Sequence, residues 1–238
     1  MSKEFKFKQF TVSQDKSAMK IGTDGVLLGA WVNPENSFSI LDIGTGTGII
    51  ALQMAQRTNA EIIDALEIDA DAFEQAVDNF EQSDWGDRLF CYHASLQEFV
   101  DEIVDEYDFI ISNPPFYTTT YKQGEISDKR ILARHSESLT YSALLEAASK
   151  LLSKKGSCAF IIPFEEEKRF LEIANQQELF ANRITRVKGT ATSAIKRSLL
   201  QLSFEKTEIE ASELIIEIER HIYTQDYIDL VREFYLKM

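Results

Sequence analysis

From residue 39 onward the chain alternates short apolar runs with longer amphipathic stretches, and this pattern restricts the fold more than any other feature of the sequence. Runs of about four to eight apolar residues are typical of buried strands, and apolar residues three or four apart are typical of helices. Strands that alternate with helices form a parallel sheet covered on both faces. We expect strands over 39–42, 61–68, 88–94, 107–112 and 157–163, and helices over 49–57, 71–82, 96–102 and 141–152.

The last part of the chain has a different pattern, because strand-like runs over 184–187, 197–204 and 214–219 follow one another with little helix between them. We therefore expect the sheet to end in antiparallel strands, followed by an amphipathic helix over 225–236. Before the first strand, a Gly-Thr-Asp-Gly turn at 22–25 leads into an apolar segment that ends near Trp31. Residues 1–38 are too few for a separate domain, so we expect one domain over 1–238 with 1–38 as an amino-terminal extension.

Composition excludes several classes of protein. The chain has 238 residues, of which 44% are hydrophobic, as in an ordinary globular domain. Its apolar runs are far shorter than the ~20 residues that cross a bilayer, and its start lacks a secretory signal pattern, so we expect no membrane contact and a cytoplasmic location. Cys91 and Cys158 each fall within an expected strand, which favours free buried thiols. The histidines lack metal-ligand spacing, so no metal is expected, and the oligomeric state is left open.

A glycine-rich loop, LDIGTGTG over 41–48, lies between the first expected strand and the first expected helix. Gly44, Gly46 and Gly48 allow the backbone to approach a ligand and to adopt positive φ. Ile49 stands where the dinucleotide-binding fingerprint has its third glycine, and no Gly-Lys-Ser/Thr follows the loop. The loop therefore predicts a ligand without a diphosphate.

Two acidic residues narrow the identity of that ligand. Asp42, before the glycines, would accept a hydrogen bond from a cationic amine, and Glu67, at the end of the next strand, lies where an acid binds ribose hydroxyls. S-adenosylmethionine carries both an amine and a ribose, so we expect it as the cofactor.

The sequence Asn113-Pro114-Pro115-Phe116 directly follows the fourth expected strand, at the same edge of the sheet as the glycine loop. The side-chain oxygen of Asn113 and the carbonyl of Pro114 would accept the two N–H groups of a planar amine, and Phe116 would stack on its ring. No general base is evident, and none is strictly required, because the proton can leave after the new bond forms. As a bare tetrapeptide, the same motif would be only a rigid turn.

These motifs together resemble the class I S-adenosylmethionine-dependent amino-methyltransferases. More closely, FKQF at 7–10, AMKIGTDGVLLGAW at 18–31, the loop at 41–48 and the motif ending at Phe116 are similar to the bacterial tRNA(Val) adenine-N6 methyltransferases. The resemblance extends from about residue 5 to the C-terminus. It implies a seven-stranded, mostly parallel, Rossmann-like sheet, S-adenosylmethionine as methyl donor, and the adenine immediately 3′ of the anticodon as target.

The resemblance also assigns roles to residues. Asp42 and the three glycines would line the methionine part of the cofactor, Glu67 would bind its ribose, and Thr23 and Asp24 would close the site from the extension. Ser95 stands where the family commonly has an acid that binds the cofactor's adenine, and it offers a neutral acceptor instead. Phe116 replaces a frequent tyrosine and keeps only the stacking surface.

The net charge of −14 is unusual for a protein that binds nucleic acid. The distribution of charge weakens this objection, because residues 179–204 contain five basic residues and no acid, and the first 22 residues contain five lysines against two acids. A polar loop over 117–138 lies between the two clusters. Each cluster would alternatively be a solvated face. The candidate tRNA-binding residues are Lys122, Arg130, Arg183, Arg186, Lys188 and Arg197.

Three other functions compete with methylation of tRNA adenine. A protein glutamine amide presents the same planar NH₂ group, although such enzymes resemble this core with an added helical substrate domain in front. A DNA adenine methyltransferase would need a separate target-recognition domain. A catalytically silent cofactor-binding or RNA-chaperone module would not need the intact Asn-Pro-Pro-Phe motif.

Overall fold

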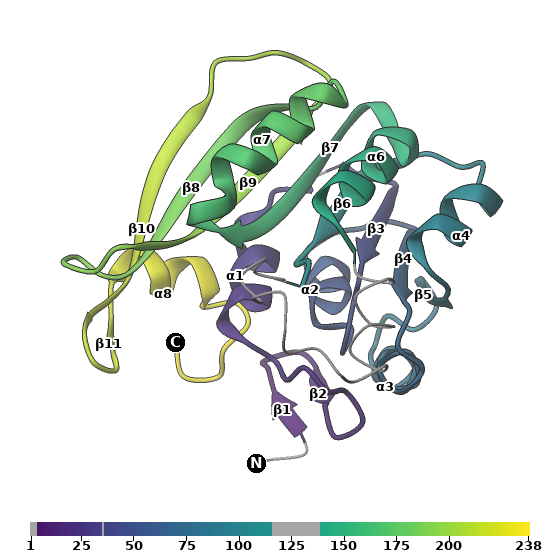
Figure 1. The fold of residues 1–238 in the computed structure, drawn as a ribbon. Coiled ribbons are helices and arrows are strands. Elements are labelled where there is room, and N and C mark those ends of the chain that lie inside the picture. The colour runs from purple at the N-terminus through teal and green to yellow at the C-terminus, as the bar shows by residue number, and fades with distance from the viewer. Residues whose placement is uncertain (1–3, 35, 116–138) are drawn as a thin grey trace, which may run out of the picture.

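The computed structural model describes residues 4–34, 36–115 and 139–238. In this part of the chain, nine strands form one sheet that helices cover on both faces (Figure 1). The strands are β3 (Ser39–Ile43), β4 (Ile62–Glu67), β5 (Leu89–His93), β6 (Tyr107–Ser112), β7 (Leu152–Pro163), β8 (Phe180–Thr190), β9 (Ile195–Ser203), β10 (Glu210–Glu219) and β11 (Ile222–Tyr223). Their order across the sheet is β11-β10-β8-β9-β7-β6-β3-β4-β5.

The five neighbouring strands β5, β4, β3, β6 and β7 run parallel. Strand β9 runs antiparallel to both β7 and β8. Strand β10 is parallel to β8, and β11 turns back antiparallel to β10. A mostly parallel sheet with antiparallel strands near the end of the chain is therefore confirmed. The expected count of seven was too small, because β10 and β11 extend the seven strands from β5 to β8 at one edge.

Helices form the outer layers. Helices α1 (Thr23–Trp31), α2 (Ile49–Arg57), α3 (Ala70–Glu81) and α8 (Gln225–Val231) pack on one face, and α4 (Leu96–Glu102), α6 (Tyr141–Leu151) and α7 (Glu167–Gln176) pack on the other. Successive residues of a strand point to opposite faces. Accordingly, Phe109 and Ile111 of β6 enter the core under α2, while Ile110 enters the core under α6. The result is two separate apolar cores, one on each side of the sheet.

The expected turn at 22–25 is wrong for most of its length, because Thr23 begins α1 and Gly22 is its N-cap. The helix crosses α2 closely at its glycines: a Cβ on Gly29 would lie 2.2 Å from the Gln53 side chain, and a Cβ on Gly25 would lie 3.6 Å from Ile49. These glycines therefore serve helix packing, which a single sequence does not distinguish from turn formation.

Three further features of the fold were missed or misplaced. Helix α7 was not expected, because it buries only Phe170, Ala174 and the acidic Glu167 and so has a weak apolar pattern. The amino-terminal hairpin of β1 (Glu4–Lys6) and β2 (Thr11–Ser13) is also new. The carboxyl-terminal helix ends at Val231 rather than near 236, and Tyr235 instead forms a bridge with Phe7.

Candidate active site

Two loops meet at the carboxyl ends of β3 and β6. The chain leaves β3 toward β4 and β5 on one side and returns to β6 on the other, so this edge is the topological switch point at which open α/β sheets bind ligands. Asp42 of β3 pairs with Ile111 of β6, and Ser112 Oγ donates a hydrogen bond of 2.7 Å to the carbonyl of Ile43. The glycine loop and the Asn-Pro-Pro segment are therefore neighbours, as the sequence predicted.

The glycine loop is held at its base and open at its tip. The amides of Gly44 and Thr45 donate to the carbonyl of Leu66 at 2.8 and 3.0 Å. Gly44 and Gly46 have φ of 72° and 60°, and a Cβ on either would meet no atom of a described residue within 4 Å. Gly48, with φ of 80°, is the N-cap of α2, and a Cβ there would lie 2.5 Å from the Phe80 ring. The first two glycines thus border open space, and the third allows α3 to pack closely.

Asp42 is a fully buried carboxyl at the base of this loop. Its Oδ2 accepts a hydrogen bond of 2.6 Å from Thr45 Oγ1, whereas its buried Oδ1 makes no hydrogen bond of ordinary geometry to a described residue. Burial raises the pKa of Asp42 to about 7, and the charge of Glu67 adds to the rise, while Thr45 and the Ala51 amide oppose it. An unpaired buried acceptor with a raised pKa fits a cationic donor supplied by a ligand.

Glu67 lies at the end of β4, where the sequence placed it, and it supports the loop directly. Its Oε2 accepts from the Gly46 amide at 2.8 Å, and its Oε1 accepts from the amides of Ile68 and Asp69 at 2.9 Å each. A carboxylate has about four acceptor positions, so one remains for a further donor. Glu67 therefore fixes the shape of the glycine loop, a role that the sequence did not indicate.

Asn113 follows β6 with its side chain beside α1. A Cβ on Gly25 would lie 3.9 Å from Asn113 Nδ2, so this amide sits against the first turn of that helix. The Oδ1 atom of Asn113 is buried and has no hydrogen-bond partner among the described residues. Pro114 is buried and Pro115 is half-buried, while Phe116 lies outside the described residues. An unpaired acceptor next to the open glycine loop can receive an N–H group of a substrate.

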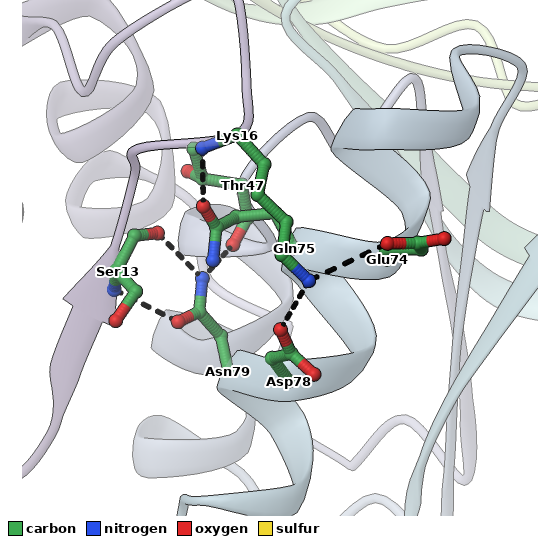
Figure 2. A network of polar contacts seen from close by, with 7 residues as sticks. All are labelled: Ser13, Lys16, Thr47, Glu74, Gln75, Asp78 and Asn79. Carbon is green, nitrogen blue, oxygen red and sulfur yellow. Dashed lines mark hydrogen bonds and ion pairs between the residues drawn. The ribbon is translucent and has the colours of Figure 1, made fainter.

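Helix α3 ties the amino-terminal segment to the glycine loop (Figure 2). Asn79 Nδ2 donates to the carbonyls of Ser13 and Thr47 at 2.9 and 2.8 Å, and its Oδ1 accepts from the Ser13 amide at 2.8 Å. One turn earlier, Gln75 Oε1 accepts from the Lys16 amide at 2.9 Å. Neither amide was predicted from the sequence, although their spacing of four residues on the inner face of a predicted helix was the available signal.

Thr23 and Asp24, the two candidates from the extension, form the first turn of α1. Asp24 Oδ2 is 2.7 Å from Arg197 Nε of β9, so this ion pair joins the extension to the sheet at the same edge as the loops. Thr23 and Asp24 are distant from Asn113 in the chain but lie near it in space, because a Cβ on the next residue, Gly25, would lie 3.9 Å from Asn113 Nδ2.

Ser95 is the N-cap of α4 and belongs to a capping box with Glu98. Ser95 Oγ donates to Glu98 Oε2 at 2.7 Å, and Glu98 Oε2 also accepts from the Ser95 amide at 2.9 Å. These bonds lower the pKa of Glu98. Beyond its predicted role, Ser95 therefore has a structural one that the sequence analysis did not identify.

The predicted basic residues separate into two groups. Arg183 lies 4.4 Å from the centre of the Trp31 ring, and Arg186 is 2.7 Å from Glu167, so both have partners within the fold. Lys188 and Arg197 lie together at the carboxyl end of β8 and the start of β9. They too have partners, because Lys188 pairs with Glu213 at 2.6 Å and Arg197 with Asp24 at 2.7 Å. Lys122 and Arg130 lie outside the described residues.

Burial raises the pKa of the Cys91 thiol to about 12 and that of the Cys158 thiol further, so neither is reactive near neutral pH. Over 4–34, 36–115 and 139–238, no cluster of at least three His, Cys, Asp or Glu side chains is suited to a metal ion. None of the helices in the described part of the chain is long and apolar enough to span a bilayer.

Comparison with known proteins identifies the family. The model of the methyltransferase small domain matches residues 17–182. A tRNA1(Val) (adenine(37)-N6)-methyltransferase from Flavobacterium johnsoniae is 62% identical over 98% of this chain and 100% of its own length. A protein of the same name from Bacteroides fragilis is 45% identical over 98% of both chains.

Solved structures agree on the fold. A predicted O-methyltransferase from Agrobacterium tumefaciens superposes with a TM-score of 0.68 at 18% identity, over 89% of this chain and 96% of that one. At this identity the likeness shows the fold alone, and the fold is that of the class I methyltransferases. Identity over nearly the whole length of both sequences is more specific: the chain belongs to the tRNA1(Val) (adenine(37)-N6)-methyltransferase family, within the methyltransferase small-domain proteins.

Proposed function

We propose that this protein transfers a methyl group from S-adenosylmethionine to the N6 amine of an adenine in tRNA, the adenine at position 37 of tRNA1(Val). The observation that carries the proposal is the buried Oδ1 of Asn113, which has no hydrogen-bond partner among the described residues and lies next to an open glycine loop. The choice of nucleotide follows the printed names of the relatives, three of which are at least 59% identical.

Asn113 would position the reacting amine. The N6 amine has two N–H donors and a lone pair that is delocalised into the ring. Hydrogen bonds to Asn113 Oδ1 and to the Pro114 carbonyl would satisfy both donors and direct the lone pair outward. Proline adds no competing donor of its own, because it lacks a backbone N–H. Phe116 would then stack on the base.

The residues around the glycine loop fit the cofactor. Bound S-adenosylmethionine supplies an electrophilic methyl group on a sulfonium. Asp42 Oδ1, buried and without a hydrogen bond of ordinary geometry to a described residue, would accept from the ammonium group, and the open backbone at Gly44 and Gly46 would leave room for the methionine part. Gly48 would complete the loop at the start of α2, and Glu67 has acceptor capacity left for ribose. Ser95 Oγ, already bonded to Glu98, would offer a lone pair to the adenine amine.

No general base is needed in this scheme. The amine nitrogen would form its new bond to the methyl carbon as the carbon–sulfur bond breaks, which leaves a neutral thioether, and the nitrogen would then lose one proton to water. Asn113 Oδ1 would stabilise the positive charge that develops on the amine in the transition state.

Residues 1–238 would act as one methyltransferase domain, with 1–38 closing the cofactor site through Thr23 and Asp24. The contacts of Asn79 with Ser13 and Thr47 support this, because they connect the extension to the glycine loop. The tRNA would contact Lys188 and Arg197, together with Lys122, Arg130, Arg183 and Arg186. A cytoplasmic location follows from a tRNA substrate.

The test is tritium transfer from labelled S-adenosylmethionine to tRNA, DNA and soluble protein in parallel. We expect label in tRNA alone and N6-methyladenosine among the digested nucleosides. A tRNA1(Val) transcript with guanosine in place of the target adenosine should remain unlabelled. Label in protein glutamine, or equal labelling of the guanosine transcript, would overturn the proposal.

A further inference from the structure

A cavity of about 850 Å³ lies beside the first turn of α1. Thr23 and Asp24 line the cavity, and Gly25, the next residue, lies against Asn113. The other walls come from the ends of β8 and β10, the start of β9, helix α8 and both termini. Its volume is within the range of about 300–1,000 Å³ that is usual for small-ligand pockets. The cavity thus opens at the same edge of the sheet as the methylation site, with the start of α1 between them.

The charge of the cavity wall is opposite to that of the whole protein. The chain has a net charge of −14, but only two acids, Asp24 and Glu217, line the cavity. Five basic residues line it: Lys6, Lys188, Lys196, Arg197 and Lys237. Lys188 and Arg197 are partly neutralised, because they pair with Glu213 at 2.6 Å and with Asp24 at 2.7 Å.

The other three lysines of the wall form no ion pair with a described residue, and they belong to segments that are distant in the sequence. One lysine of the amino-terminal cluster, Lys6, and three basic residues from 179–204 therefore lie on one wall. Such a wall suits an anionic ligand.

Aromatic rings form another part of the wall. The rings of Tyr223 and Tyr227 are 5.3 Å apart, and those of Phe5 and Tyr235 are 6.1 Å apart. All three tyrosines line the cavity, but Tyr227 is buried, whereas Tyr223 and Tyr235 are half-buried. Aromatic faces beside lysine and arginine are the means by which proteins hold single nucleotides of an RNA strand, through base stacking and phosphate contacts.

We propose that this cavity binds a nucleotide next to the methylated adenosine in the tRNA strand, with its base on Tyr223 and its phosphate groups near Lys6 and Lys196. This inference rests on the proposed function. The cofactor is a poor candidate for the occupant, because neither Asp42 nor any residue of the glycine loop lines the cavity. The subsite would hold the strand in an unstacked form while the target base enters the site at Asn113.

The first experiment tests the charges. The double variant Lys6→Glu/Lys196→Glu is compared with the control Lys154→Glu/Lys155→Glu. The control makes the same change in net charge at exposed positions near the amino end of β7, away from the cavity. We expect the first variant to lose at least tenfold in tRNA affinity and to show a salt slope shallower by about two, because phosphate contacts release counterions. The control variant should keep the wild-type slope, and cofactor affinity should be unchanged in both.

The second experiment tests the base. Synthetic tRNA lacking the base on the 5′ or the 3′ side of the target adenosine is methylated by wild-type protein and by Tyr223→Leu. With intact tRNA, Tyr223→Leu should lose about 5- to 100-fold in kcat/KM. For wild-type protein one of the two abasic substrates should lose a similar factor, and that substrate should be methylated equally by both proteins.

The outcomes distinguish the two proposals. Suppose that intact tRNA is methylated at the expected adenosine, but that Tyr223→Leu lowers kcat/KM by the same factor with the abasic substrates as with intact tRNA. The subsite is then wrong, and the proposed function stands. The same holds if both charge-reversal variants share one salt slope. If wild-type protein does not methylate tRNA at all, both proposals fail.

Discussion

Asn79 Nδ2 lies 2.8 Å from the carbonyl oxygen of Thr47, and this bond joins helix α3 to the glycine loop from beneath. The same amide group also holds both backbone groups of Ser13, so the loop and the amino-terminal segment share one buried side chain that is only 1% exposed. The glycine loop and the amino-terminal segment are therefore linked through a single side chain.

The first prediction concerns this shared contact. Asn79→Ala should lower the free energy of unfolding by about 2–4 kcal/mol, because three hydrogen bonds are lost and buried backbone groups stay unpaired. Cofactor affinity should fall as well, since the loop loses its support. Urea unfolding and calorimetric titration measure the two effects.

Lys16→Ala is the matched control, because Lys16 packs against the same helix through an exposed ion pair with Asp78 at 2.7 Å. It should change stability and affinity little. If Asn79→Ala behaves like Lys16→Ala, the contact with Thr47 does not support the loop.

The second prediction concerns Gly48. Gly48→Ala should destabilise the fold by about 2–4 kcal/mol, because the new Cβ would lie 2.5 Å from the Phe80 ring and would occupy a left-handed conformation. Gly22→Ser is the control, since a Cβ at this N-cap meets no atom within 4 Å and serine is a favourable cap. Thermal unfolding of both variants checks this, and equal midpoints would refute the packing argument.

The third prediction concerns pH. The pKa of Asp42 is raised to about 7, so below this pH a bound cation must displace a proton. Affinity for S-adenosylmethionine should fall below pH 7 by up to about tenfold per pH unit and level off above it. In Asp42→Asn, affinity should be lower and this component of the pH dependence should vanish. Titration of both proteins from pH 5.5 to 8.5 isolates Asp42, because the ligand's own ionisation is common to them.

The stability of the ligand-free protein should respond in the opposite direction. The folded-state pKa of Asp42 lies above its unfolded value of 3.8, so the folded protein retains a proton that the unfolded chain releases. The contribution of this group to stability should therefore decline as pH rises from about 4 to about 7. A wild-type protein whose stability, relative to Asp42→Asn, does not decline over this interval would contradict the raised pKa.

The sequence predicted the central sheet well, because buried parallel strands have continuous apolar runs, as in Tyr107–Ser112, whose bounds match the structure. It was less informative where one residue type serves two purposes. Gly25 and Gly29 favour a turn by propensity but allow α1 to approach α2. Helix α7 was not predicted because one of its three buried residues is the charged Glu167, which accepts hydrogen bonds from Arg186 and Ser198.

The candidate site was likewise predicted only in part. Motif spacing was sufficient to bring Asp42, Glu67 and Asn113 to one edge of the sheet, because the carboxyl ends of parallel strands meet there. The amide network of Asn79 and the capping box of Ser95 depend on which atoms meet after folding. The cavity beside α1 depends on segments that are distant in sequence, so no local pattern reveals it.

The central claim is that Asn113 Oδ1 accepts a hydrogen bond from the reacting amine. The single-turnover rate of methyl transfer by Asn113→Ala at saturating cofactor tests this claim most directly. Asn182→Ala is the control, because Asn182 also has a buried, unpaired Oδ1 but lies on β8. We predict a rate lower by about 10²–10³-fold for Asn113→Ala, with cofactor affinity within about twofold of wild type, and a near-normal rate for Asn182→Ala. An Asn113→Ala rate above about half that of wild type would contradict the account.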